Sequence, residues 1–432
     1  MQQAQQAVHR HVHALGATHP LYPMKQQAWQ RLQQLGFPTA QNEAYKYTPI
    51  TTVLPDAPDL YPSPPNACSK LTKQDLLPYL RPKNDGYQLV FVNGQLRKDL
   101  MDLEDAQLPW DYLTLQEAYL QNPTAFTPYA AQATDPFVAL NTALCTEGTV
   151  IRIPDHTVLD QPLYIHHITD ACSYPRLHVW MGKNSHAQLV MDWQTLGTHP
   201  QFTNALTAIT LDTGAQLQYY TLQTRMQQAH QIHTAQCYQA SHSVLHTHYF
   251  TWGGNLVRNN LHTYLQGPHA EAYMYGLYSP NAYQHVDNHT RVDHQAPNTQ
   301  SHELYKGIIG DHATGIFNGG IGVQPAAQKT RAFQSNHNML MTDQATLHTK
   351  PQLEIYADDV KCSHGATIGQ LDEAQLFYLR ARGIPMSTAR HMLLYAFVKD
   401  IVNAVNLPAL WEQLDQDLQA VLATFELDTA SA

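Results

Sequence analysis

Short runs of alternating apolar and polar residues dominate the chain from about residue 137 to residue 370. Frequent turn residues separate these runs, among them TVIRIP, PLYIHHI, RLHVWM, AQLVMDW, LTAITL and AQLQYYTLQT. An alternation with a period of two places successive side chains on opposite faces of a strand. The pattern therefore predicts many short strands over this region.

A small pattern recurs where these strands begin: a turn residue, then Ala, then a small or polar residue. It occurs six times, with its alanine at Ala187, Ala215, Ala270, Ala313, Ala345 and Ala366. A small residue at a corner lets successive coils stack closely, and an irregular period of roughly 20 to 30 residues favours a parallel β-helix or solenoid. The copy at Gly365-Ala366-Thr367 would form the last corner. A long antiparallel sandwich is the alternative that this pattern leaves open.

Other local patterns precede the strands. The spacing of Ala28, Leu32 and Leu35 predicts a helix over residues 23–35, which Gly36 ends. Three further segments follow: a Pro-rich linker or extended segment at 51–67, a strand at 87–93 closed by an Asn-Gly turn, and a helical stretch near 114–121.

Helical periodicity returns after residue 370. Asp372 can cap a first helix that runs through Leu379, and Ser387 can cap a second. The faces expected to be apolar are Ala389, Leu393, Phe397 and Ile401 in the second helix, and Leu414, Leu418, Val421 and Phe425 in a third that starts at Pro408. Such helices can cap the open edges of a solenoid, which is the default interpretation, or provide a docking platform for another protein, and the two roles are not exclusive.

These patterns predict three regions. Residues 1–85 form an N-terminal helical region with the Pro-rich linker, and residues 86–370 form a mainly β, parallel β-helix core whose regular repeats start at about residue 137. Residues 371–432 form a C-terminal helical domain.

Composition changes this picture in one respect. Of the 432 residues, 43% are hydrophobic but only 14% are charged, against roughly 25% charged in an average soluble protein. Gln, Asn, Thr and 26 His replace the missing charge, and their side chains suit hydrogen-bonded ladders on stacked strands. The net charge of −10 argues against nucleic-acid binding.

The chain also shows no sign of membrane insertion or export. No segment approaches the ~20 apolar residues of a membrane span, and the N-terminus MQQAQQAVHR does not resemble a signal sequence. The five cysteines are widely spaced without a C-x-x-C pair, which predicts reduced thiols in a cytoplasmic protein.

Known catalytic motifs are missing from the sequence. It contains no phosphate-binding loop, no G-x-S-x-G elbow and no H-E-x-x-H pair, so any ATP chemistry would come from a partner. The segment VDNHTRVDHQAP gathers Asp287, His289, Asp293 and His294, which gives a first metal-site hypothesis. A structural role for these residues is the alternative, because histidine is common throughout the chain.

Cys362 and His364 form the second candidate site. Their spacing of two places both side chains on one face of a strand. Thiolate and imidazole together suit iron, zinc or sulfur chemistry, although zinc and iron–sulfur sites take four ligands. Either further ligands come from elsewhere, across an interface for example, or Cys362 is a buried cysteine at a tight corner, the interpretation that residue types alone favour.

Long ordered segments of the sequence resemble the SufB/SufD family of iron–sulfur cluster assembly proteins. The resemblance runs from about residue 23 to residue 405 and is carried by GFPTAQNEAYKYTPI, FVALNTAL, DHQAPNTQSHELYKGII and QSNHNMLMTDQATLHTKPQLEIYADDVKCSHGATIGQLDEAQLFYLRARGI. The family fold is a right-handed parallel β-helix between helical regions, which agrees with the division proposed above.

The resemblance implies partners and a site. It implies that the end of the β-helix pairs with a SufB-like paralogue, and that Cys362 and His364 lie at that interface as ligands of a nascent cluster shared with the partner. It implies that a SufC-like ATPase binds the C-terminal helices, where Leu393, Phe397, Asp400 and Ile401 would contact it. The iron–sulfur cluster would be transient, with no cofactor tightly bound to the isolated chain.

The function expected from this resemblance is that of a non-catalytic scaffold subunit in an iron–sulfur assembly complex. The alternatives are a β-helix enzyme that acts on polysaccharides and a homodimeric structural protein. An enzyme of that class needs a cleft with clustered Asp, Lys or Arg, whereas the strand region here is poor in charge. Such enzymes are also usually secreted, and no signal sequence is expected here. An isolated chain with exposed strand edges can self-pair, so a homodimer is plausible.

Overall fold

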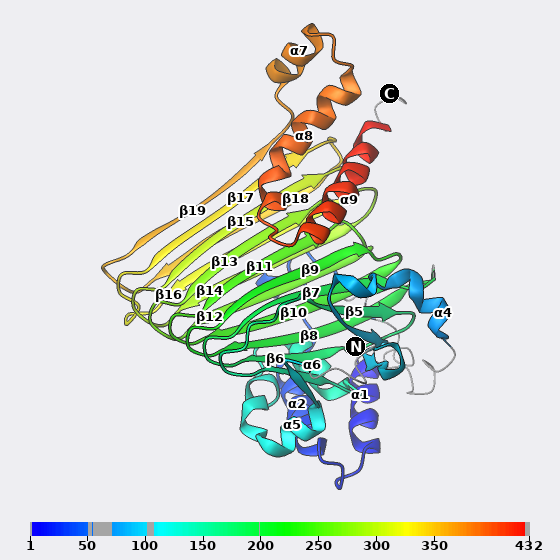
Figure 1. Ribbon diagram of the computed structural model, residues 1–432, viewed down its shortest axis with the longest axis vertical. Coiled ribbons are helices and arrows are strands. Elements are labelled where there is room, and N and C mark those ends of the chain that lie inside the picture. The colour runs from blue at the N-terminus through cyan, green and yellow to red at the C-terminus, as the bar shows by residue number, and fades with distance from the viewer. Residues whose placement is uncertain (1, 51–53, 55–70, 102–107, 198, 428–432) are drawn as a thin grey trace.

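The computed structural model describes residues 2–50, 54, 71–101, 108–197 and 199–427. Apart from Leu54, the predicted Pro-rich segment 51–67 lies outside the described residues. The body of the molecule is a tapering stack of long strands, with helices at both ends of the chain (Figure 1).

Two sheets make up the solenoid, and the chain alternates between them. In spatial order, one sheet contains β2 (Gln95–Leu96), β1 (Tyr87–Val92), β5 (Leu163–Thr169), β7 (His186–Thr195), β9 (Gln216–Arg225), β11 (Val244–Thr251), β13 (Glu271–Tyr278), β15 (Gln300–Ile309), β17 (Arg331–Leu340) and β19 (Lys361–Gly369). The other contains β3 (Asp111–Thr114), β4 (Thr149–Ile153), β6 (Arg176–Met181), β8 (Gln201–Leu211), β10 (Ala229–Gln239), β12 (Leu256–Leu265), β14 (His285–His294), β16 (Thr314–Val323) and β18 (Thr346–Ile355).

Strand pairing decides between the two fold classes considered above. The pairs β1–β2 and β3–β4 are antiparallel, whereas the successive coils, from β5–β7 to β17–β19, pair in parallel. A sandwich of antiparallel strands is therefore excluded, and the predicted parallel solenoid with flanking helices is confirmed.

The corner alanines explain how closely the coils stack. Five of the six predicted corners lie where a strand begins, and their alanines are at most 9% exposed: Ala187, Ala215, Ala270, Ala313 and Ala345. The sixth prediction is wrong, because Ala366 lies in the middle of β19 and is exposed. The chain runs through this position as one uninterrupted strand, and no described coil stacks beyond it.

Stacked amides fill part of the interior, as the composition predicts. The Gln223 amide donates to Gln231 on β10 and to Asn259 on β12, both at 2.7 Å. The Asn259 amide donates in turn to Asn288 on β14 at 3.1 Å. These side chains are fully buried, and their mutual hydrogen bonds offset the cost of removing amides from water.

At the N-terminal end, α1 (Gln2–Ala14), α2 (Tyr22–Leu35) and α6 (Pro136–Leu144) share one apolar cluster with the outer face of the second sheet, where Phe202, Leu206 and Ile232 lie. The expected start of strand repeats near residue 137 is wrong, because α6 occupies that position and every residue from 137 to 144 is buried. A helix that is apolar all round shows no period that distinguishes it from a buried strand. The short helices α4 (Lys73–Leu76) and α5 (Leu115–Gln121) complete this end.

Three helices follow the last strand: α7 (Glu373–Ala381), α8 (Met386–Asn403) and α9 (Pro408–Leu427). Asp372 caps α7 as predicted, with a hydrogen bond of 2.8 Å from the amide of Ala374. Ser387 does not cap α8, which begins one residue earlier after Pro385. None of the helices in the described ranges is long and apolar enough to cross a membrane.

The C-terminal helices cover a face of the solenoid and not its end. Leu394, Val398, Leu414 and Leu418 pack with Phe250 and other outward-facing residues of the first sheet. Ala389 and Ile401 of α8 are buried as predicted, but Leu394 and Val398 are buried in place of Leu393 and Phe397, which are half-buried. Figure 1 shows α8 and α9 against the sheet, while α7 projects past β19.

The corner alanines give a first test. Ala270→Leu should lower the free energy of unfolding by about 1–3 kcal/mol, because a buried corner has no room for added methylenes. Ala366→Leu, in the exposed β19, should change it by less than about 0.5 kcal/mol. Urea unfolding followed by circular dichroism measures both changes, and equal losses in the two variants would contradict the difference between these alanines.

Candidate interface site

The last coil of the solenoid is its open end. β19 pairs with β17 and β18 pairs with β16, and among the described strands neither has a partner on its other side. Most residues of β19 are exposed and those of β18 are exposed or half-buried. The two unpaired strand edges and the interior face between them are therefore open to another molecule.

Cys362 and His364 lie on this last coil and face the solenoid interior. In the parallel register Cys362 is next to Ala332 and His364 is next to Gln334, and both of these β17 residues are fully buried. Cys362 is half-buried and packs at the edge of a small apolar cluster with Leu353, whereas His364 is exposed. The structure thus places the two candidate ligands on one face, as their spacing predicts.

The pair does not form a complete metal site by itself. Burial raises the pKa of the Cys362 thiol, partly offset by a hydrogen bond from the Ala332 backbone, so the free chain presents a thiol near neutral pH. Within the described ranges, no group of three or more His, Cys, Asp or Glu side chains is arranged to hold a metal ion. None of the four described cysteines forms a disulfide.

The metal-site hypothesis at Asp287, His289, Asp293 and His294 is wrong for the described structure. Asp287 pairs with Arg258 at 2.5 Å, and Asp293 pairs with Arg291 at 2.8 Å. His294 lies on the opposite face of β14, where its Nδ1 is 2.8 Å from Thr299. Arginine partners already neutralise the carboxylates, and strand alternation separates the fourth residue from the others.

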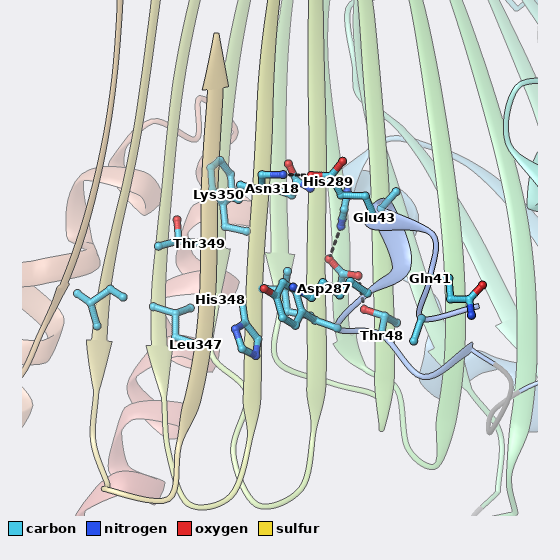
Figure 2. Close-up of a pocket in the computed structure, with 17 residues that line it drawn as sticks. Gln41, Glu43, Thr48, Asp287, His289, Asn318, Leu347, His348, Thr349 and Lys350 are labelled. Carbon is cyan, nitrogen blue, oxygen red and sulfur yellow. Dashed lines mark hydrogen bonds and ion pairs between the residues drawn. The ribbon is translucent and has the colours of Figure 1, made fainter. Parts of the chain in front are cut away.

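A pocket of about 770 Å³ opens beside the last coil, between residues 40–48 and the strands β14, β16 and β18 (Figure 2). It extends around the edge of β18, since Leu347 and Thr349 on the inner face line it together with His348 and Lys350 on the outer face. Ile368 of β19 also lines it, so the pocket connects residues 40–48 to the open end.

Residues 42–48, which include the 3-10 helix η1 (Glu43–Tyr45), are held on the solenoid by a buried arginine. Arg258 donates to the Ala44 carbonyl at 2.8 Å and lies 3.9 Å from the centre of the Tyr45 ring. The Tyr45 hydroxyl donates to Asp135 at 2.6 Å, and Asp135 also caps α6. Arg258 therefore orients residues 42–48, and Tyr45 connects this segment to α6 through Asp135.

Outer contacts complete this attachment. Thr48 donates to Asp287, Glu43 pairs with Lys350, and Tyr47 stacks on His348 with ring centres 3.8 Å apart. Burial alone would raise the pKa of Asp287, but the charge of Arg258 and the contacts with His289 and Thr48 lower it overall. Asp287 is therefore ionised at neutral pH and balances the charge of Arg258.

The four C-terminal candidates occupy different environments. Ile401 is 0% exposed and packs against the solenoid, whereas Leu393 is half-buried on α8. Lys306 of β15 donates to the Phe397 carbonyl at 2.7 Å and pairs with Asp400 at 2.8 Å. The structure thus assigns Phe397, Asp400 and Ile401 to the attachment of α8 to the sheet. Their contact with another chain stays a prediction.

Sequence reasoning missed this attachment and the N-terminal anchor. Arg258, Asp287 and Lys306 are separated from their partners by long stretches of chain, and no local pattern predicts these pairings. The available signal was the quoted segment NEAYKYT itself, whose mixture of Tyr, Thr and Glu suits an extended segment bound to a polar surface.

Two family models match the chain. The SufBD protein N-terminal region matches residues 2–165, and the SUF system FeS cluster assembly, SufBD core domain, matches residues 164–397. Together the two models cover the solenoid, the anchored segment and most of α8. The chain therefore belongs to the SufB/SufD family of iron–sulfur cluster assembly proteins.

Particular relatives refine this assignment. The chain is 31% identical over 399 residues to the iron–sulfur cluster assembly protein SufD of Escherichia coli, with 91% of each chain covered. It is 30% identical to the SufBD family protein slr0076 of Synechocystis, with 76% of each chain covered. It is 29% identical to the chloroplastic protein ABCI7 of Arabidopsis thaliana, over 62% of this chain and 59% of that one.

The chain resembles the SufD branch of the family. The similarity to the Escherichia coli SufD protein, which covers 91% of each chain, supports this branch.

The buried anchor gives a second test. Asp287→Asn should lower the free energy of unfolding by about 3–5 kcal/mol, because it leaves Arg258 buried without a counter-charge. Since the folded pKa of Asp287 is lowered, its stabilisation is complete above the unfolded value of about 3.9 and declines as the pH falls below that value. Urea unfolding at pH 7 and under acidic conditions measures this. The difference in free energy of unfolding between Asp287→Asn and wild type should be smaller under acidic conditions than at pH 7.

Lys350→Gln is the matched control for this test. It breaks the exposed pair with Glu43 and should change stability much less than Asp287→Asn does. A large loss in Lys350→Gln with none in Asp287→Asn would show that the buried arginine is not the anchor.

Proposed function

We propose that this chain is a non-catalytic, SufD-like scaffold subunit of a cytoplasmic complex that assembles iron–sulfur clusters. The open end of the solenoid pairs with a SufB-like paralogue, and the C-terminal helices bind a SufC-like ATPase. The cluster is the cargo of the complex and is bound transiently at the interface, with no cofactor tightly bound to the isolated chain.

The observation that carries this proposal is the position of Cys362 and His364. Both face the interior on β19, whose free edge can pair with a strand of a partner. The Cys362 thiolate and the His364 imidazole can each bind iron in a cluster, but two protein ligands are too few to hold a cluster permanently. A partner that supplies the remaining ligands would assemble the site, and its separation would release the cargo.

The C-terminal helices support the second contact. α7 projects away from the solenoid and exposes Phe377 and Tyr378, and the next helix, α8, carries the half-buried Leu393. Ile401 packs in the cluster between α8 and the sheet and so holds the helix in place. A partner bound here is connected to β15 through Lys306 and Asp400.

The polysaccharide enzyme has less support. The pocket beside the last coil contains two carboxyl groups, Glu43 and Asp287, and the pKa of each is lowered, chiefly by Lys350 in the first case and by Arg258 against the effect of burial in the second. Glycoside hydrolysis needs one carboxyl with a raised pKa as general acid. Glycan cleavage by the isolated chain would nevertheless favour the enzyme.

His364→Ala should impair cluster assembly without unfolding the chain. In cells that depend on this gene under iron limitation, we expect growth and iron–sulfur enzyme activity to fall, because the complex loses an exchangeable ligand. His312→Ala removes another exposed histidine, at a corner, and should behave as wild type. Normal growth of the His364→Ala strain would count strongly against the proposal.

Removal of residues 386–432 should abolish co-purification with a SufC-like ATPase. Because this deletion also uncovers Phe250 and other apolar residues of the sheet, Leu393→Arg is the variant that keeps the fold. We expect it to weaken ATPase capture at least tenfold, about 1.4 kcal/mol. Val158→Arg, at an exposed apolar position near the other end of the solenoid, is the control, and capture that is unchanged by Leu393→Arg would refute this docking surface.

A further inference from the structure

One interior row of side chains runs along the first sheet to His364. In the parallel register, Met274 of β13 is next to Glu303 of β15, Glu303 is next to Gln334 of β17, and Gln334 is next to His364 of β19. Neighbouring strands are about 4.8 Å apart, so side chains in one row can touch. The row therefore changes from an apolar residue to three polar residues as it approaches the open end.

Glu303 and Gln334 are each 1% exposed and are bonded to each other. The Gln334 Nε2 donates to the Glu303 Oε2 at 2.6 Å. This bond fixes the orientation of the amide, because only its nitrogen can donate. The amide oxygen of Gln334 consequently remains as a free acceptor.

That acceptor has no hydrogen-bond partner within the described part of the chain. The Gln334 Oε1 and the Glu303 Oε1 are both buried and unpaired. A buried unpaired acceptor costs about 1–3 kcal/mol, so its presence calls for a physical reason. The nearest polar side chain further along the row is that of His364.

The opposite sheet leaves room for this arrangement. A Cβ on Gly319 of β16 would lie 2.3 Å from the Gln334 Nε2, so any larger residue there would displace the amide. Gly319 does not have a positive φ, so its backbone conformation does not require glycine. The lack of space for a side chain beside Gln334 does. The Glu303–Gln334 pair is thus built into the packing between the sheets.

The ionised form of Glu303 fixes the amide. Burial raises the pKa of Glu303 to about 7, an effect that the neighbouring Thr290 and Gln334 side chains reduce in part. The ionised carboxylate only accepts hydrogen bonds and therefore holds the amide nitrogen of Gln334, whereas a neutral carboxyl can also donate to the amide oxygen. Glu303 therefore orients the amide above neutral pH, where the tautomer of His364 is measured.

We propose that Gln334, oriented by Glu303, is a positioning residue for His364: its Oε1 accepts a hydrogen bond from one ring nitrogen and leaves the other nitrogen for the cluster. The second part of this inference rests on the proposed function. Metal-binding histidines commonly donate their other ring N–H to an oxygen acceptor, which fixes the tautomer and the ring orientation. Gln334 provides that acceptor inside this chain, while partners supply further cluster ligands.

The tautomer of His364 tests the proposal directly. In the full-length chain labelled with ¹⁵N-histidine at pH 8, the His364 signals are those absent from His364→Gln. We expect one tautomer in wild type, and the mixture of an unconstrained imidazole in Gln334→Leu. Glu303→Gln keeps an acceptor for the Gln334 amide and should retain the wild-type signals, whereas Glu303→Leu should lose them.

Asn338→Leu is the structural control. Asn338 is buried on the same strand and face, but its register partner is Ile368. It should lose stability without changing the His364 signals. Two results would overturn the positioning role. One is that the His364 signals of Gln334→Leu match those of wild type, and the other is that Asn338→Leu changes these signals as much as Gln334→Leu does.

A second measurement separates this proposal from the proposed function. In the complex with the paralogue and the ATPase, cluster formation from ferrous iron and sulfide is followed by absorbance. Gln334→Leu should slow cluster formation by about 10–100-fold. Glu303→Leu should also slow cluster formation, and Glu303→Gln should form the cluster faster than Glu303→Leu does. If His364→Ala itself has no effect, the proposed function fails. If His364→Ala slows assembly while Gln334→Leu leaves both rate and tautomer unchanged, only the positioning role fails.

Discussion

Parallel in-register pairing imposes one constraint on the whole molecule: each coil needs another coil beside it. The interior coils satisfy their backbone groups and cover their alternate side chains by stacking, as the buried corner alanines show. The last coil, β18 and β19, has no described neighbour on its far side. Its edges and its interior face are therefore the natural place for another chain, and the candidate ligands lie there.

The same stacking explains the unusual composition. Gln, Asn, Thr and His can lie inside a solenoid because the next coil brings a matching polar group, as in the contacts among Gln223, Asn259 and Asn288. A charge has no such repeating partner and is costly in the interior. One buried pair of opposite charges, Arg258 and Asp287, lies beneath residues 42–48 and attaches the N-terminal segment.

Local pattern predicts what depends on neighbouring residues. Strand alternation, five corner alanines and the Asp372 cap were predictable, as was the common face of Cys362 and His364. The α6 helix was not, since a uniformly buried segment such as residues 137–144 lacks a distinguishing period. On α8, Ala389 and Ile401 were predicted correctly, but Leu394 and Val398 are buried in place of Leu393 and Phe397, because the sheet against which they pack determines the buried face.

Contacts between neighbouring coils cannot be predicted from local sequence patterns for a different reason. Glu303 and Gln334 are 31 residues apart, while other neighbouring coils bring together residues 26 or 29 apart, such as Thr207 with His233 and Arg258 with Asp287. Turn lengths vary from coil to coil, so the register that places Gln334 beside His364 follows only from the folded chain.

This register gives the open end two unlike surfaces. On the inner side of β19, Gln334 and Glu303 offer His364 a fixed acceptor. The other surface of β19 carries Gly365 and Gly369, where an added Cβ would meet nothing within 4 Å. A partner strand can therefore approach β19 closely. Because the free chain keeps the Cys362 thiol protonated near neutral pH, a cluster must displace a proton to bind there. Under the proposed function, a site with one oriented imidazole and one protonated thiol would hold the cluster only while the partner supplies further ligands, as assembly and release require.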